Sequence, residues 1–339
     1  MRGAKRFMVT QARFGHALWR QIISQQIHTT SAISSSNNNS SHGPDSKQKV
    51  DYEIRPMRSS DIDGLYALLS ENQWNMERDY LQCVFDTDPS GLVVVVTNDG
   101  QIIGHNGILA HSDKVASSGM NIVSEGYREL GIGRKLFHSV MEVMKDRNVG
   151  GTSLSNRVSF YAQFGWIIPS FTLHYNQGPV NPHFVSAPTK VDGLEIVPIA
   201  DVSFSDVLSY DAEIHTIARP KYLRNWALFE KAESYAALKN GKVCGYSVLR
   251  RADVGYKMYP LFADDKHIAH ALFCKMASFI PRGEDLIFTQ PIENEEATKF
   301  VTGNKLTNYL TMTRLYNQWE VEVDVSRVYS TSSTEYSIV

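Results

Sequence analysis

A glycine-containing loop between a short apolar run and an amphipathic segment constrains the fold of this chain more than any other feature. The apolar run, Met120 to Val123, is typical of a β-strand, and the loop after it has the pattern Arg128-x-x-Gly131-x-Gly133. Apolar residues then recur at helical spacing as far as Met144. The first amides of a helix lack internal partners and favour negative charge, and glycines let the main chain approach a ligand. The stretch therefore predicts strand, loop and helix in an order that suits a diphosphate.

Two neighbouring patterns make this prediction more specific. Upstream, Asn98-Asp99-Gly100 joins the apolar runs 92–96 and 102–109, which indicates a β-hairpin. Downstream, Asn156 precedes Phe160-Tyr161 and Phe164-Gly165-Trp166, after a strand that is expected over 151–155. In this order the motifs resemble the GCN5-related N-acetyltransferase (GNAT) superfamily, with its R/Q-x-x-G-x-G/A acyl-CoA loop. The resemblance covers 52–180 and implies a mixed α/β domain whose mostly antiparallel sheet is flanked by helices.

The resemblance also implies a donor, acetyl-CoA or another acyl-CoA, and residues that would bind it. The pyrophosphate would lie on main-chain amides at the start of the helix, and the pantetheine arm along the strand before it. The amide of Val123 would polarise the thioester carbonyl. Glu125 stands where the family often has proline. The residues expected to bind the donor are Ile122, Val123, Arg128, Glu129, Leu130, Gly131, Ile132, Gly133, Arg134 and Asn156.

Two of the expected site residues also have structural interpretations. Asn156 matches the family position that bonds pantetheine, but it would equally serve as a helix N-cap. Tyr161 matches the tyrosine that protonates the departing thiolate, but it could be a core aromatic beside Phe160. No general base is identifiable, because His105, Glu125 and His174 are candidates by residue type alone.

The second half of the chain repeats the first more faintly. Gly241 and Gly245 follow Gly100 and Gly104 at one offset, which indicates a tandem fold. Residues 194–318 resemble the C-terminal GNAT-like domain of the YitH/HolE type. This copy has Asp264 to Ala269 in place of the glycine loop and Lys299 in place of Tyr161, so we expect a degenerate domain that shapes the acceptor pocket. A linker is expected at 181–193, punctuated by prolines that include Pro182 and Pro188, and a loose Ser/Thr-rich tail at 319–339.

The first 44 residues have the composition of a mitochondrial transit peptide. Five basic residues, no acid and a Ser/Thr/Asn-rich stretch precede Asp45. A disordered basic tail is the alternative. We therefore expect the protein in the mitochondrial matrix, with the cytoplasm as the alternative location. Removing these five charges from a formal net charge of −2 leaves about −7, which argues against a nucleic-acid partner.

Composition narrows the remaining classes of function. The three cysteines are scattered, without C-x-x-C spacing, so neither a zinc site nor a disulfide framework is expected. No apolar run is long enough for a membrane span. We therefore expect an enzyme without a metal that moves acetyl from acetyl-CoA to a primary amine on a small molecule. A non-catalytic acyl-CoA-binding regulator or sensor is the alternative.

Overall fold

The computed structural model describes residues 50–144, 146–186 and 191–339. Residues 51–339 form one compact unit. The predicted transit peptide and Pro188 of the predicted linker lie outside the described residues. Mitochondrial location thus stays a prediction, which import of the full chain into isolated mitochondria would check. Within the described ranges, no helix has both the length and the apolar character needed to cross a bilayer.

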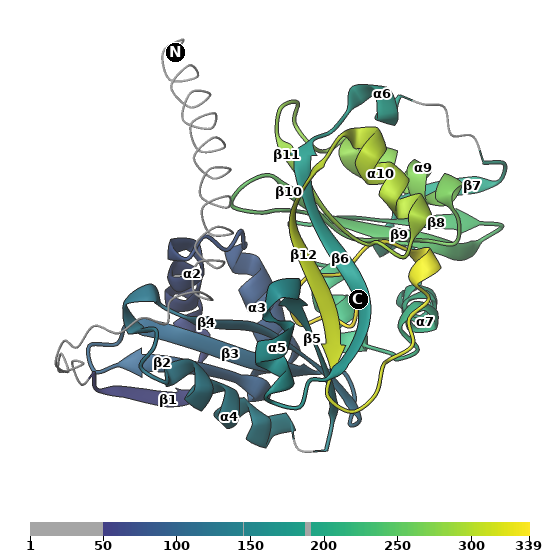
Figure 1. Cartoon of the computed structure of the whole chain (residues 1–339). Helices are drawn as coiled ribbons and strands as arrows, with labels where there is room; N and C mark the ends of the chain where they lie inside the picture. Colours follow the sequence, from purple (N-terminus) through teal and green to yellow (C-terminus); the bar gives the residue numbers. More distant parts are fainter. Residues whose placement is uncertain (1–49, 145, 187–190) are drawn as a thin grey trace, which may run out of the picture. The chain divides into compact units, whose positions relative to one another are not determined.

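The first half alternates strands and helices, as the sequence predicts (Figure 1). The hairpin turns at Gly100, whose φ of 89° suits glycine. The strand before the glycine loop begins earlier than its apolar run, because small buried residues such as Ser117 extend it. The elements are β1 (Tyr52–Pro56), α2 (Ile62–Glu71), α3 (Arg78–Thr87), β2 (Leu92–Thr97), β3 (Ile102–Ala110), β4 (Val115–Val123), α4 (Ile132–Met144), β5 (Asn148–Leu154), α5 (Val158–Ala162) and β6 (Ile168–Pro179).

Helices cover both faces of this half of the sheet. Side chains alternate between the faces of a strand. In β2, Leu92 and Val94 join the core cluster of α2 and α3, whereas Val93 and Val95 join that of α4. Because both faces are covered, β2 is a nearly continuous apolar run and not an alternating one.

The second half repeats this order, which confirms the predicted tandem of mixed, mostly antiparallel α/β domains. Its hairpin turns at Asn240-Gly241, which both have positive φ. A short helix, α6 (Pro182–Val185), lies within the predicted linker. The elements after it are β7 (Leu194–Pro198), α7 (Phe204–His215), α8 (Pro220–Ala227), β8 (Glu233–Lys239), β9 (Lys242–Arg251), β10 (Tyr256–Ala263), α9 (Lys266–Ala277), β11 (Asp285–Pro291), α10 (Glu295–Asn304), β12 (Thr307–Tyr316) and β13 (Val328–Ser330).

The two halves exchange their last strands and share one sheet. The strand order is β1-β2-β3-β4-β5-β12-β6-β11-β10-β9-β8-β7. Strand β12, from the second half, completes the first half beside β5, and β6, from the first half, completes the second half beside β11. The two exchanged strands pair antiparallel with each other in the middle of the sheet (Figure 1). Neither half therefore closes its sheet with its own strands.

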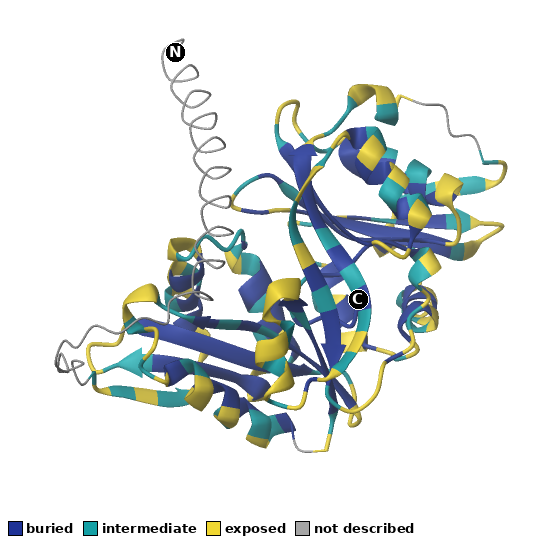
Figure 2. Ribbon diagram, in the orientation of Figure 1, coloured by how far each residue is buried: buried dark blue, intermediate teal, exposed yellow. Residues whose placement is uncertain are grey.

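The C-terminal residues pack into the core, so the expectation of a loose tail is wrong. Tyr336, Ile338 and Val339 are each no more than 2% exposed, and β13 pairs with β10. Figure 2 shows that many residues of the central strands are buried. The Ser/Thr-rich composition suggested solvation, but most of these hydroxyl side chains are buried, and the Ser333 and Ser337 hydroxyls make hydrogen bonds there.

We predict that a fragment of residues 51–180 does not form a stable monomer. Without β12 its β5 edge is unpaired, and β6 has no partner strand, so both invite pairing between copies. Size-exclusion chromatography with circular dichroism should show dimers or aggregates, while 51–339 elutes as a folded protein. A folded, monomeric fragment would contradict the idea that the exchange is needed for stability.

Candidate functional site

Strands β4 and β5 run parallel and then separate, which opens a gap in the sheet. Their ladder runs from Val115 opposite Asn148 to Ser118 opposite Gly151. Beyond these residues β4 continues to Val123 and β5 to Leu154, but the two strands no longer pair with each other. We call this opening the first splay. It lies where the sequence predicts that an acyl-CoA arm meets the strand.

A bulge and the ladder pattern direct one amide into the first splay. Met120 has a φ of 55°, and β4 has one more residue than β3 at this point. The Ser124 amide bonds the carbonyl of Ile103 at 2.8 Å. Since bonded and non-bonded pairs alternate along an antiparallel ladder, Val123 and its partner form a non-bonded pair. The Val123 amide therefore points away from β3, toward β5, where a thioester carbonyl could accept a hydrogen bond from it.

The glycine loop is open where an anion would bind. Glu129 and Gly131 both have positive φ, at 65° and 78°. A Cβ on Gly131 would meet nothing within 4 Å, so the outer side of the loop is accessible. Leu130 and Ile132 anchor the loop to the core beside α4, where the first amides of the helix begin. Arg134 lies exposed in that first turn. This geometry fits the predicted pyrophosphate site.

Arg128 occupies a more specific position than the sequence indicates. Its Nε donates to the carbonyl of Val123 at 3.0 Å, and its Nη2 donates to Asn72 Oδ1 at 2.8 Å. The side chain is exposed, and it links the end of β4 to the end of α2. Whether it also contacts a phosphate stays a prediction.

Tyr161 and Asn156 lie beside the first splay. The Tyr161 ring stacks on Trp166, with centroids 5.7 Å apart. Burial raises the pKa of the Tyr161 phenol, and a hydrogen bond with the side chain of Asn121 on β4 opposes that rise. No motif in the sequence points to Asn121. Asn156 is exposed just after β5, and Arg157, not Asn156, is the N-cap of α5.

The histidines considered as bases lie elsewhere or are engaged. His105 is 1% exposed, and its Nε2 lies 2.8 Å from the hydroxyl of Tyr336. His174 is on β6, between β11 and β12. Glu125 is exposed in the turn after β4. None of the three is placed by these contacts in the first splay.

The corresponding gap in the second half is filled by the chain itself. Strands β10 and β11 pair only at Tyr256 and Lys257, and β13 lies in the opening beyond them. The Thr331 amide donates to the carbonyl of Thr289 on β11 at 2.9 Å. Asn294, the counterpart of Asn156, donates through Nδ2 to the carbonyls of Val325, Ser326 and Val328 at 2.9–3.1 Å. An extended chain with amide groups thus occupies this opening, which we call the second splay.

The N-terminal amides of the helix that follows the second splay, α9, are already engaged and are not free for an anion. Asp265 is the N-cap of α9, and its carboxylate accepts from the amides of His267 and Ile268 at 2.8 and 3.0 Å. These amides are the ones that a pyrophosphate would need. Lys299, the counterpart of Tyr161, is exposed and pairs with Glu296 at 2.7 Å. These contacts support the expectation that the second copy lacks the catalytic residues.

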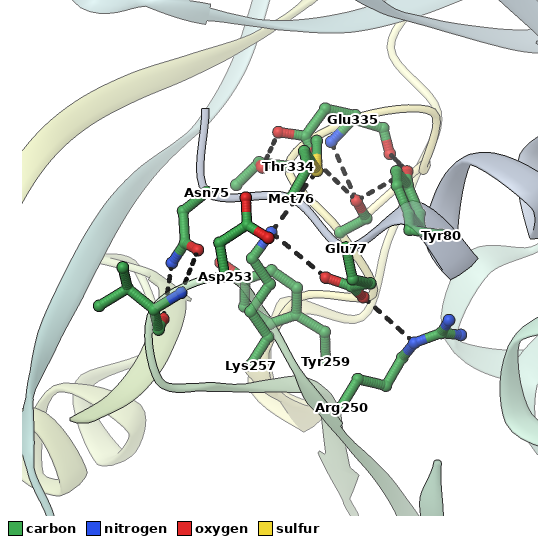
Figure 3. Close-up of polar contacts among 12 residues, drawn as sticks. Asn75, Met76, Glu77, Tyr80, Arg250, Asp253, Lys257, Tyr259, Thr334 and Glu335 are labelled. Carbon is green, nitrogen blue, oxygen red and sulfur yellow. Dashed lines mark hydrogen bonds and ion pairs between the residues drawn. The ribbon is translucent and has the colours of Figure 1, made fainter. Parts of the chain in front are cut away.

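A buried polar cluster lies where the second half meets α2 and α3 (Figure 3). Glu77 lies 3.2 Å from Arg250 and 3.9 Å from Lys257, and both cations are nearly fully buried. Asn75 bonds the backbone of Val254 through both side-chain atoms. No local pattern in the sequence indicates this cluster, because its members come from segments about 180 residues apart.

Comparisons with known proteins agree with this geometry. Residues 59–166 match the acetyltransferase (GNAT) family, and residues 207–330 match a second model described as an acetyltransferase (GNAT) domain. Holothin acyltransferase of Pseudoalteromonas sp. (strain SANK 73390) is 22% identical over 222 residues, 65% of this chain and 72% of that protein. A putative [ribosomal protein bS18]-alanine N-acetyltransferase of Bacillus subtilis (strain 168) is 29% identical over 126 residues, 34% of this chain and 82% of that protein.

Solved structures share the fold over most of the chain. A putative acetyltransferase from Pyrococcus horikoshii has a TM-score of 0.68 at 16% identity, covering 87% of this chain and 99% of its own. A tandem GNAT protein from the clavulanic acid biosynthesis pathway has a TM-score of 0.59 at 15% identity, and the match covers 78% of this chain and 98% of that one. Both similarities extend across the two halves, which supports the tandem architecture.

We predict that acid destabilises the fold through buried histidines such as His105. Burial lowers its pKa to about 4 from 6.5. The folded state therefore favours the neutral imidazole. Its contribution to the free energy of unfolding is complete above pH 6.5 and is lost as the pH falls toward 4. This shift corresponds to about 3 kcal/mol. Denaturant unfolding across this range should show a weaker pH dependence for His105→Gln than for the exposed control His138→Gln. Equal slopes would contradict the prediction.

Proposed function

Because this chain belongs to the GNAT superfamily and carries two of its domains in tandem, we propose that its first half transfers an acetyl group from acetyl-CoA to a primary amine. The observation that carries this proposal is the contrast between the two splays. The second is filled by an extended peptide held by Asn294, whereas in the first, β4 and β5 separate with Asn156 exposed beside them. A pantetheine arm is likewise an extended chain with amide groups, so it suits the first splay.

The donor in this proposal binds along β4 and the start of α4. The amides of Leu130 to Gly133 receive the pyrophosphate, and Arg134 adds positive charge beside them. Ile122 and Val123 face the pantetheine, and Asn156 bonds one of its amides. The Val123 amide stabilises the oxyanion that forms when the amine attacks the thioester carbonyl.

We infer that the second half restricts access to the acceptor side, which favours a small molecule. The β9–β10 turn is fastened to the first half at two points, by Asn75 with Val254 and by the hydroxyl of Tyr66 with Asp253. The ion pairs of Glu77 lie beside these contacts. A folded protein presenting a lysine would have to displace them, whereas a small amine would not.

We expect Arg128→Glu to weaken acetyl-CoA binding by tenfold or more. The variant removes the bond to the Val123 carbonyl and places a negative charge beside the glycine loop; a hydrogen bond to a charged group contributes about 1.5–3 kcal/mol. Calorimetric titration of residues 51–339 would measure the loss. Lys266→Glu, the matching change at the start of α9, should bind like wild type. If Lys266→Glu weakened binding and Arg128→Glu did not, the donor would bind to the second half. If the wild type did not bind acetyl-CoA, the proposal would be overturned.

We expect Tyr161→Phe to lower kcat by roughly 10²-fold or more, because general acid catalysis contributes about that much. The donor Kd should stay within twofold, because phenylalanine keeps the ring that stacks on Trp166. Release of free thiol from acetyl-CoA with a panel of primary amines is the assay, and Tyr52→Phe is the control. Unchanged turnover would make Tyr161 a packing residue. Tight donor binding without turnover on any amine would favour the acyl-CoA-binding regulator.

A further inference from the structure

The segment after β13 leaves the second splay and runs to the first. Tyr336 lies over β3 and β4, where two glycines make room for it. A Cβ on Gly107 would lie 2.4 Å from the Tyr336 hydroxyl, and one on Gly119 would lie 2.9 Å from its backbone nitrogen. The bond to His105 anchors the same ring. The last residues of the chain are therefore fixed against the strands that form the first splay.

This course places Glu335 at the point where the first splay opens. Gly119 is the first residue of β4 beyond the ladder with β5, and it directly precedes the bulge at Met120. A Cβ on Gly119 would lie 3.1 Å from Glu335 Cβ. Glu335 thus takes the space that a side chain at position 119 would occupy.

Glu335 and Tyr161 approach the splay from opposite faces of the sheet. Tyr336 and Met120 belong to the core cluster of α2 and α3, whereas Tyr161 packs with the cluster of α4. The hydroxyl of Tyr80, on α3, donates to the Glu335 carbonyl at 3.1 Å. A thioester in the splay would therefore have its sulfur toward Tyr161 and its open carbonyl face toward Glu335.

The carboxylate of Glu335 is oriented by two hydroxyl groups. The Ser333 hydroxyl donates to Oε2 at 3.0 Å, and the Thr334 hydroxyl donates to Oε1. The residue is half-buried, and among the described residues it has no basic group within ion-pair distance. The neighbouring acids differ, because Glu77 lies between two cations and Asp253 is bonded by the Tyr66 hydroxyl.

We propose that Glu335, supplied by the C-terminal segment of the second half, binds the acceptor as an ammonium ion and removes its proton at the first splay. This inference rests on the proposed acetyl transfer. The carboxylate takes one proton from R–NH₃⁺, and the neutral nitrogen attacks the thioester carbonyl carbon. When the C–S bond breaks, its electron pair leaves with sulfur, which takes the proton of the Tyr161 phenol. The second nitrogen proton restores the phenol through solvent, and Glu335 releases the first proton to solvent. The acceptor class is thus a primary amine that is cationic at neutral pH.

Two amine probes of different charge test this role. Ethylamine is an ammonium ion at neutral pH, whereas hydroxylamine is mostly uncharged and needs no base before attack. For Glu335→Gln we expect acetyl transfer to ethylamine to fall by roughly 10²-fold or more and transfer to hydroxylamine by less than about tenfold. Glu335→Asp should restore part of the rate, and the exposed control Glu322→Gln should match wild type.

The outcomes separate this inference from the function on which it rests. Acetyl-CoA titration and thermal unfolding of each variant show whether the donor site and the fold are intact. If Glu335→Gln binds acetyl-CoA normally and acetylates ethylamine like wild type, or loses both probes equally, Glu335 is not the base while acetyl transfer stands. If the wild type binds acetyl-CoA but acetylates neither probe, transfer to small amines fails, and the role of Glu335 fails with it.

Discussion

The antiparallel pairing of β6 with β12 joins the two halves into one sheet, and the other features of the site depend on it. Strand β6 also pairs with β11 and strand β12 with β5, so the halves have fixed positions within the unit. This geometry brings the β9–β10 turn against α2 and α3, where Asn75 and Glu77 bind it. It also directs the segment after β12 back across both splays. A separable pair of domains would have no such fixed contacts between the two halves.

The two copies divide their tasks through a single segment. Residues near β13 occupy the second splay with the contacts that a ligand would make, and Asp265 satisfies the helix amides there. In that half the chain itself thus makes these contacts. The same segment continues to β4 and places Glu335 beside the open splay. The segment that fills the splay of one copy thus also brings a carboxylate beside the open splay of the other.

Local patterns in the sequence predict much of this fold and little of its long-range pairing. The hairpin at Gly100, the loop before α4 and the repeat at Gly241 depend on neighbouring residues, and the structure has all three. The pairing of β5 with β12 leaves no local signal, because the same residues would suit a pairing with β6. The Ser/Thr-rich composition of the tail suggested a loose segment, so its burial was not expected. Tyr336 and Ile338, which lie among its serines, are apolar enough to indicate burial. The cluster at Glu77 needs contacts across about 180 residues, which spacing cannot show.

The strand exchange has a consequence for synthesis of the chain. Strand β5 ends at Leu154 and its partner β12 begins at Thr307. At about 5–20 residues per second, the ribosome needs roughly 8–30 s to add the intervening residues. During that time the first half has its glycine loop, its helices and β4 but an unpaired edge at β5. The nascent chain therefore passes through an interval in which a chaperone, or another chain at the same stage, competes for the place of β12.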